Sequence, residues 1–313
     1  MKTNRALLCA LVQVVVLVSL ATTPGFTESQ ATVSMRVPKG PQIVVAVKVN
    51  GAGPYNFMVD TGATVTVLDT ALFHELGLRP EGLSQIASPA GTTRQIRSVV
   101  HEITLDRLSV QDITVVSMPT TILSSGNAAI RGILGENFLR HFDILIDNQR
   151  RTMTLDAGVG LADLLGGERL PITFSDLPQD DDYRYRPTIW VKTEAYGRAR
   201  VLLDSGSASI MLLQWGGELR GYGNRRSIVT VNGTVACKAA NESLHLGKRR
   251  LGDLTILNCQ SALVKPQDRE GILPTAIFKQ IFISHSGSYA IIDPTRRLNT
   301  PQEIAVVGSP QSR

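Results

Sequence analysis

The sequence predicts an all-β protein built from two similar halves, and three observations support this prediction. Most apolar residues fall in short, β-branched runs that are separated by turns. Two of these runs, residues 57–59 and 201–203, each lead into an Asp that is followed by a hydroxyl residue and a Gly. The elements after each Asp then recur in the same order, so we expect an internal duplication.

The spacing within the two halves is nearly the same. From Asp60, a Gly-Ile-Leu element begins 72 residues later (132 − 60), and the Gly of a predicted hairpin turn lies 31 residues later (91 − 60). From Asp204, the corresponding distances are 67 residues (271 − 204) and 29 residues (233 − 204). Matching order and spacing favour two copies of one structural unit.

The predicted elements are mostly short strands. A turn rich in Gly and Asn, residues 50–54, separates the first two strands, and a short helix is expected from the Asp69 cap to a stop at Gly77. Residues 86–96 form a predicted hairpin around a small-residue turn, and Asn232 with Gly233 marks the matching turn in the second half. The other expected strands are 43–49, 55–59, 99–105, 113–118, 143–146, 152–155 and 189–193.

The N-terminus has the pattern of a secretory signal peptide. Lys2 and Arg5 precede an apolar run, 6–21, that ends among small residues, so we expect residues 1–21 to be removed. An uncleaved N-terminal anchor is the alternative, although the run is shorter than the roughly 20 apolar residues of a spanning helix. No other segment has the pattern of a membrane span, and we expect an exported chain, periplasmic or extracellular, with no membrane contact after signal removal.

Composition and charge argue against nucleic-acid binding. The net charge of +5 falls to about +3 without the two basic residues of the signal (5 − 2), and aromatic residues make up 5% of the chain. The remaining basic residues occur in short clusters, which are typical of solvated surfaces. At 313 residues, the chain is long enough for two domains.

The predicted domains follow the duplication. Residues 33–160 form the first domain, 161–187 a linker that contains Pro and an acidic run at 180–182, and 188–298 the second domain. Residues 299–313 are expected to form a mobile tail. The acidic run lacks the Gly and the later Glu of a calcium-binding loop, so we assign it no chemistry.

Two cysteines, Cys237 and Cys259, remain after signal removal. An even number of cysteines in an exported chain favours a structural disulfide between them. Two buried free thiols are the alternative, because the sequence does not give the distance between the sulfur atoms.

Other catalytic chemistries have little support in the sequence. The five histidines show no metal-ligand spacing, and the chain has neither a Gly-x-Ser-x-Gly nucleophile motif nor a Gly-rich phosphate loop after a strand. We therefore expect no metal and no cofactor.

The two Asp turns resemble those of the aspartic peptidases, the group that includes pepsins and retroviral proteases. The sequence Asp-Thr-Gly-Ala at 60–63 and the sequence Asp-Ser-Gly-Ser at 204–207 match the family's Asp-Thr/Ser-Gly motif. The Gly-Ile-Leu-Gly sequence at 132–135 matches the element that lies beneath the motif in each lobe. The resemblance implies a bilobal pepsin-like fold made of two retropepsin-like β-barrel lobes, as in a two-lobed aspartyl protease of bacterial type.

The resemblance also implies an enzymatic mechanism. Asp60 and Asp204 would share a proton and activate a water molecule that attacks a peptide bond, without a metal or a covalent intermediate. Thr61 and Ser205 would brace the two turns across the lobe interface, while Gly62 and Gly206 would let backbone amides approach the carboxylates.

A difference between the two turns predicts an asymmetry within the pair. Ser207 has a hydroxyl that can donate to Asp204, whereas Ala63 offers none to Asp60. We therefore expect Asp204 to ionise more readily than Asp60, and we expect an activity optimum less acidic than that of pepsins.

The turn of the first predicted hairpin is the candidate for a flap over the site. It consists of Ser88, Pro89, Ala90, Gly91 and Thr92. Its small residues resemble those of a retroviral flap, and the expected substrate is an extended polypeptide that lies beneath it.

Three functional hypotheses remain open from the sequence. The first is a single-chain endopeptidase that acts as a monomer through Asp60 and Asp204. The second is a homodimeric protease that uses Asp60 from two chains, because Pro274 replaces the final Gly of the Gly-Ile-Leu-Gly element in the second half. The third is an exported binding module that has the same fold and no catalytic activity.

Overall fold

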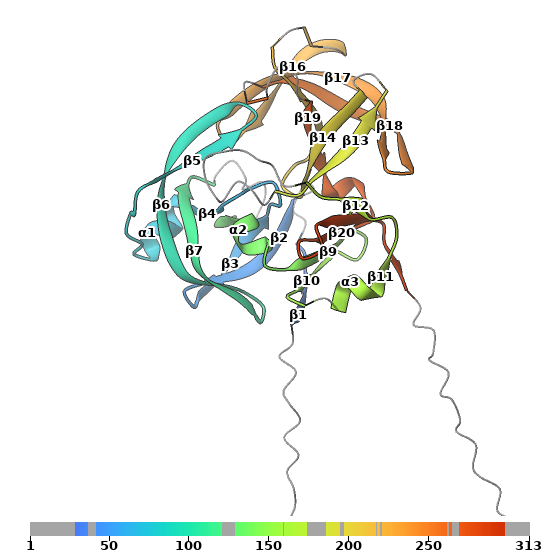
Figure 1. Cartoon of the computed structure of the whole chain (residues 1–313). Helices are drawn as coiled ribbons and strands as arrows, with labels where there is room; N and C mark the ends of the chain where they lie inside the picture. The colour runs from blue at the N-terminus through green and yellow to red at the C-terminus, as the bar shows by residue number, and fades with distance from the viewer. Residues whose placement is uncertain are drawn as a thin grey trace, which may run out of the picture.

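A computed structural model describes residues 29–297, with the exception of 37–41, 121–128, 159, 174–185, 195–196, 217, 220, 262 and 265–268. The predicted signal peptide 1–21, the acidic run 180–182 and the predicted tail 299–313 lie outside the described residues. The predicted all-β fold class is confirmed, since the described chain consists mainly of strands with three short α-helices and a 3₁₀-helix among its elements (Figure 1).

The first half forms a seven-stranded barrel. Its strand order is β2-β3-β8-β4-β7-β6-β5, and an additional pairing of β2 with β6 closes the sheet. Strand β8 lies between β3 and β4, parallel to the first and antiparallel to the second. The strands are β2 (Ile43–Val49), β3 (Ala52–Val59), β4 (Thr66–Asp69), β5 (Leu83–Ser88), β6 (Gly91–Leu105), β7 (Leu108–Met118) and β8 (Gly132–Leu134).

The second half repeats this topology strand for strand. Its order is β13-β14-β19-β15-β18-β17-β16, and β13 also pairs with β17. The repeated elements of the sequence therefore correspond to two sheets with equivalent connections. The strands are β13 (Thr188–Thr193), β14 (Gly197–Asp204), β15 (Ile210–Gln214), β16 (Tyr222–Thr230), β17 (Gly233–Leu246), β18 (Arg249–Gln260) and β19 (Glu270–Pro274).

A six-stranded sheet joins the two halves. Its order is β1-β10-β9-β20-β21-β12, and the halves meet where β9 pairs with β20. The strands are β1 (Gln30–Ser34), β9 (Asp143–Asp147), β10 (Thr152–Asp156), β12 (Leu170–Pro171), β20 (Gln280–Ser284) and β21 (Tyr289–Ile292). In Figure 1 this sheet lies below the two barrels.

The core is continuous across the halves. One cluster of buried apolar residues includes Phe57 and Phe138 from the first half together with Val201 and Leu273 from the second. Each barrel also has a smaller apolar cluster of its own. The first-barrel cluster consists of Val44, Met58, Val65, Val67, Val116, Met118, Ile130 and Ile133. The second-barrel cluster consists of Met211, Leu213, Val235, Cys237, Ala239, Leu257, Cys259, Val264 and Ile272.

Local sequence explains the first helix and corrects one turn. Helix α1 (Thr70–Glu75) has Asp69 as its N-cap, whose side chain accepts a hydrogen bond from the Ala71 amide at 3.1 Å. The predicted turn 50–54 is too long, because β3 already begins at Ala52. Asn50 and Gly51 both have positive φ angles, 50° and 79°, so two residues complete the turn.

The segment predicted as a linker, 161–187, contains regular structure in its described residues. Helix α3 (Gly160–Leu164) is followed by β11 (Leu165–Gly166), which pairs with β22 (Thr295–Arg296), and by β12, which pairs with β21. These pairings attach the described part of the segment to strands from the end of the chain.

Candidate active site

The two Asp residues of the sequence motifs occupy equivalent places. Asp60 directly follows β3, and Asp204 is the last residue of β14. Each of these strands runs parallel to the strand of a Gly-Ile-Leu element, β8 in one barrel and β19 in the other. The topology thus brings both motifs to the ends of central strands.

The two Asp turns face each other across the contact between the barrels. A Cβ atom placed on Gly62 would lie 2.7 Å from Cγ of Asp204, and one placed on Gly206 would lie 2.6 Å from Cγ of Asp60. Only glycine fits at these positions without a shift of the opposite carboxyl group. The side chains of Asp60 and Asp204 are hydrogen-bonded to each other and partly buried.

Backbone amides of each turn hold its own carboxylate. The amides of Gly62 and Ala63 donate to Oδ1 of Asp60 at 2.8 and 3.1 Å. The amide of Gly206 donates to Oδ1 of Asp204 at 2.7 Å, and the amide of Ser207 also donates to Asp204. These bonds fix the orientation of the carboxyl groups and favour their ionised forms.

Thr61 and Ser205 connect the two turns through four buried hydrogen bonds. The Thr61 hydroxyl donates to the carbonyl of Leu203 at 2.7 Å and accepts from the Ser205 amide at 3.0 Å. The Ser205 hydroxyl donates to the carbonyl of Val59 at 2.8 Å and accepts from the Thr61 amide at 3.1 Å. This reciprocal pattern holds the two Asp turns in register.

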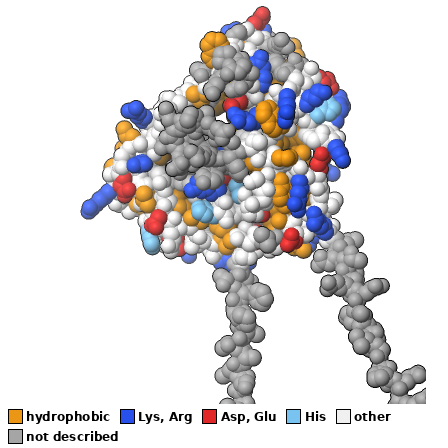
Figure 2. All heavy atoms as spheres, viewed as in Figure 1, with side chains coloured by type: hydrophobic (Ala, Val, Ile, Leu, Met, Phe, Trp, Pro, Cys, Tyr) orange, Lys and Arg blue, Asp and Glu red, His pale blue; other side chains and the backbone are white. Residues whose placement is uncertain are grey.

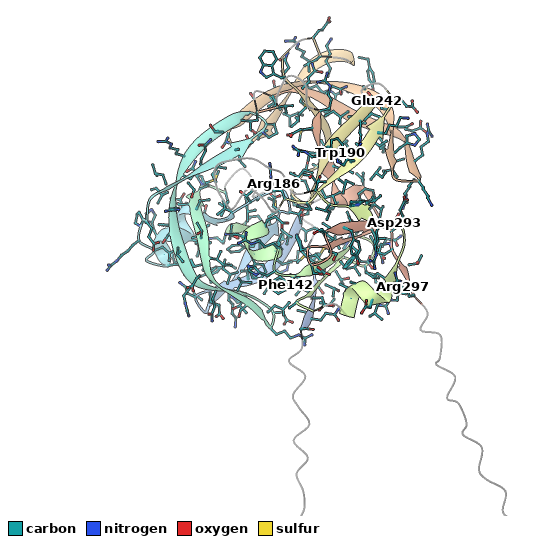
Figure 3. All side chains as sticks on the ribbon, viewed as in Figure 1. Phe142, Arg186, Trp190, Glu242, Asp293 and Arg297 are labelled. Atoms are coloured by element: carbon teal, nitrogen blue, oxygen red, sulfur yellow. A yellow bond between two sulfur atoms is a disulfide. The ribbon has the colours of Figure 1, made fainter. Side chains whose placement is uncertain are left out.

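Burial and mutual repulsion shift the titration of the pair. Desolvation raises the pKa of Asp60, although the amides of Gly62 and Ala63 and the charge of Arg186 counteract this effect. The pKa of Asp204 is raised well above its usual range, first by desolvation and then by the negative charge of Asp60. Arg186 lies between the two barrels (Figure 3). The arrangement favours one shared proton, which resides on Asp204.

This order of ionisation is the reverse of the one expected from the sequence. The Ser207 hydroxyl donates to the carbonyl of Ser209 at 3.0 Å, so it does not donate to Asp204 as predicted. The expectation overlooked a local bond: a serine in a turn readily hydrogen-bonds to backbone two residues away.

The element beneath the first Asp turn explains a glycine of the sequence motif. A Cβ atom on Gly135 would lie 2.7 Å from the backbone carbonyl of Val65. The next residue, Glu136, starts helix α2 (Glu136–Leu139), and its amide donates to the carbonyl of Ala63 at 2.8 Å. Pro274, the counterpart of Gly135, is buried and precedes a short 3₁₀-helix, Thr275–Ile277.

A buried ion pair near the site was not predicted from the sequence. His285, in the turn after β20, lies 2.9 Å from Oε2 of Glu136, and its other ring nitrogen contacts the carbonyl of Phe142 at 2.7 Å. The pKa of Glu136 is raised by desolvation, and the pKa of His285 is raised because the charge of Glu136 outweighs desolvation. A lone His and a lone Glu that are 149 residues apart give no sequence signal.

The flap candidates lie at the tip of a hairpin. Ser88 ends β5, Gly91 begins β6, and Pro89 and Ala90 form the turn between them, while Thr92 lies in β6 and is exposed. Hairpin β5–β6 and hairpin β16–β17 approach each other from the two barrels in Figure 1. The structure thus places a hairpin from each barrel on the same side of the molecule.

Cys237 and Cys259 form a disulfide. They are directly opposite each other on β17 and β18, with their Cα atoms 4.1 Å apart, and both are fully buried. The disulfide therefore connects the stem of the second hairpin to the interior of its barrel.

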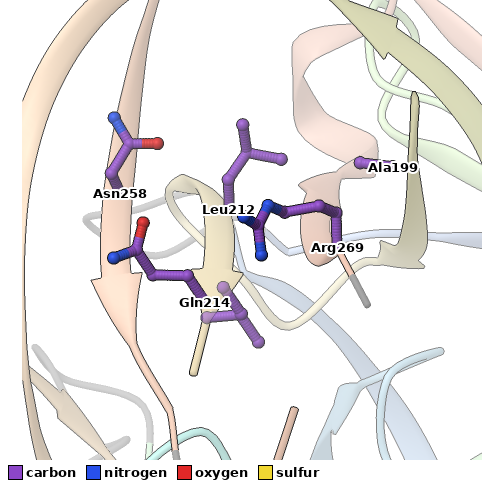
Figure 4. Close-up of a pocket in the computed structure, with 6 residues that line it drawn as sticks. Ala199, Leu212, Gln214, Asn258 and Arg269 are labelled. Atoms are coloured by element: carbon purple, nitrogen blue, oxygen red, sulfur yellow. The ribbon is translucent and has the colours of Figure 1, made fainter. Parts of the chain in front are cut away.

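Two pockets on the second half do not include the Asp pair. One is small and is lined by Ala199, Leu212, Leu213, Gln214, Asn258 and Arg269 (Figure 4). The other lies beside Trp190, which stacks with Arg198. Among the described residues, no group of three or more His, Cys, Asp or Glu side chains is arranged to hold a metal ion.

The surface shows no single large basic patch on the face in view. Lys and Arg side chains occur in groups that are separated by acidic and apolar side chains (Figure 2). No helix within the described ranges is long and apolar enough to cross a membrane.

The comparisons with known proteins confirm the resemblance to aspartic peptidases. Residues 45–138, which include the first Asp turn and the Gly-Ile-Leu-Gly element, match the model of a family described as "Aspartyl protease". Among solved structures, the chain resembles a retropepsin-like aspartic protease from Rickettsia conorii, at 18% identity and a TM-score of 0.31, over 40% of this chain and 90% of that one. A search of curated proteins found no match.

Proposed function

We propose that the chain is an aspartic endopeptidase whose catalytic residues are Asp60 and Asp204 of the same molecule. The observation that carries this proposal is the hydrogen-bonded pair of carboxyl groups between two symmetrically braced turns. The family match over residues 45–138 supports the same class of enzyme. Buried carboxyl groups of like charge are costly to maintain, so a purely structural role explains them poorly.

The proposed reaction needs one proton on the pair. Asp60, in its ionised form, accepts a proton from a water molecule as the water oxygen bonds to the peptide carbonyl carbon. Asp204 donates its proton to the carbonyl oxygen, which gives a neutral tetrahedral intermediate. The intermediate collapses when the C–N bond breaks and the amide nitrogen receives the proton held by Asp60, while Asp204 recovers its own.

The hairpins and the apolar clusters support a polypeptide substrate. Ile86 of the first hairpin packs against the first-barrel cluster, and Ala90 packs against the second-barrel cluster. An extended chain beneath the hairpins would place apolar side chains beside the scissile bond. We propose that residues 33–160 and 188–298 act as the two lobes of a monomer that is exported after removal of residues 1–21.

The homodimer hypothesis requires the pairing of Asp60 with a second Asp60. In the structure, Asp204 of the same chain already occupies the place opposite Asp60. We therefore favour a monomer, and an inactive binding module remains as an outcome of the experiment below.

The experiment compares cleavage of an unfolded protein by wild type, Asp60→Asn and Asp204→Asn, from about pH 3 to about pH 7. We expect both substitutions to reduce the rate at least about a thousandfold, with activity lost on the alkaline side as the pair loses its shared proton. Asp106→Asn is the matched control, because Asp106 is exposed in a turn and has a positive φ that Asn tolerates.

Each alternative predicts a different result. Loss of activity in Asp60→Asn alone would indicate a homodimer. A folded mature wild type without activity would indicate a binding module.

A further inference from the structure

The tips of the two hairpins are joined by hydrogen bonds between the barrels. The turn after β16 consists of Val231 and Asn232, and the turn after β5 consists of Pro89 and Ala90. The hydroxyls of Ser88 and Thr230 are 3.0 Å apart. The closed arrangement of the hairpins is therefore built from specific polar contacts.

Asn232 makes three of these contacts with its side chain. Its amide nitrogen donates to the carbonyl of Ile86 and to the carbonyl of Gly91, both at 2.9 Å. Its amide oxygen accepts from the Thr93 hydroxyl at 3.0 Å. Both N–H groups and the oxygen of one side chain are thus bound to the two strands of the opposite hairpin.

The contact is one-sided although the two barrels share a topology. Asn232 precedes Gly233 in the second hairpin, whereas Ala90 precedes Gly91 in the first. Ala90 has no polar side-chain atom and packs instead against the second-barrel cluster. The second hairpin therefore supplies the polar side chain, and the first supplies backbone carbonyls and an apolar contact.

We propose that Asn232 is a positioning residue that holds the first hairpin closed over the Asp pair, and that the bond must open to admit an extended polypeptide. The first hairpin is suited to this role because Ile86 packs with Ala63, which follows the Asp60 turn, in the first-barrel cluster. This inference rests on the proposed function. It adds a residue from the second lobe that controls the covering of the site.

The test uses hydrogen exchange and kinetics. In the Asp60→Asn background, Asn232→Ala should raise amide exchange in residues 83–97 at least about tenfold and leave β9 and β20 unchanged. In the active enzyme, the same substitution should raise KM about tenfold, while kcat changes less than about twofold. Asn241→Ala is the matched control, since Asn241 is an exposed residue of the same strand and bonds to Tyr222.

A second variant separates the clamp from general packing. The side chain in Asn232→Asp has nearly the same size, but its carboxylate cannot donate to the two carbonyls. Its protonated form can donate to one of them, so exchange in residues 83–97 should slow as the pH falls below about 4. Exchange in residues 83–97 that is unchanged by both variants would overturn the proposal. Because exchange is measured without catalysis, it tests the clamp even if the wild type cleaves nothing.

Discussion

Thr61 and Ser205 show how much one hydroxyl group can determine in a buried turn. Each hydroxyl donates to a carbonyl and accepts from an amide of the other barrel, so each satisfies two backbone groups that water does not reach. A buried polar group without a partner costs more than the net gain from an ordinary hydrogen bond. These two residues therefore contribute to both stability and the alignment of the carboxyl groups.

We predict that Thr61→Val destabilises the protein. The substitution keeps the size and shape of the side chain but leaves the Leu203 carbonyl and the Ser205 amide without a partner. The free energy of unfolding should fall by about 2–4 kcal/mol. Thr32→Val, which removes an exposed hydroxyl bonded to Thr154, is the control and should cost less than about 0.5 kcal/mol. Chemical denaturation measures both, and equal effects would contradict the account.

At this scale, the sequence predicted which residues meet but not how protons are distributed among them. The Asp, hydroxyl and Gly positions are set by a short motif that repeats, and the structure brings both copies together. The order of ionisation depends on bonds that the motif does not specify. Ser207 bonds to Ser209, and Arg186 comes from a segment far from both motifs.

Helix α2 connects the Asp turn to the sheet that joins the barrels. Its first residue, Glu136, bonds through its amide to Ala63 and through its carboxylate to His285 of the second half. Asp143 accepts hydrogen bonds from Ser284 and from Ser286, on either side of His285. A titratable pair thus lies between the floor of the site and the joining sheet.

We predict that this pair makes stability depend on pH above neutrality. The folded pKa of His285 is raised above 6.5, so the stabilisation is fully present below about pH 6.5 and is lost as the pH rises through the folded value. The raised pKa of Glu136 acts in the same direction. Asp60, Arg140, His141 and Asp143 are the other titratable or charged groups that act on the pair.

The measurement is the free energy of unfolding of wild type and His285→Gln between about pH 6 and about pH 9. For one linked proton, the wild-type value should fall by up to about 1.4 kcal/mol per pH unit, and the variant should show a smaller slope. His101→Gln is the control, because His101 is exposed on β6. Equal slopes in wild type and His285→Gln would contradict the prediction.

At the scale of elements, alternation and turn residues predicted most strands. The buried face of β2 follows the period of two, and the Asp69 cap placed α1 correctly. The joining sheet was not predicted, because its pairs link residues far apart in the sequence, such as Asp147 with Gln280. Short apolar strands do not encode which distant strand they will pair with.

The whole molecule consists of two barrels of equivalent topology, one joining sheet and a shared core. The repeated spacing in the sequence predicted the two equivalent units. It could not predict the contact between the hairpin tips, since an Asn-Gly turn specifies a backbone shape and not the partner of the Asn side chain. Symmetry of topology thus coexists with asymmetry at Asn232 and at the Asp pair.

The central claim is that one chain contains a complete catalytic pair. The most direct test is the cleavage rate per chain, measured as the wild-type concentration is lowered over a wide range. A site within one chain predicts a rate per chain that is independent of concentration, because no association precedes catalysis. A rate per chain that falls toward zero on dilution, and is restored when the chain is concentrated again, would contradict the account and indicate a site formed by two chains.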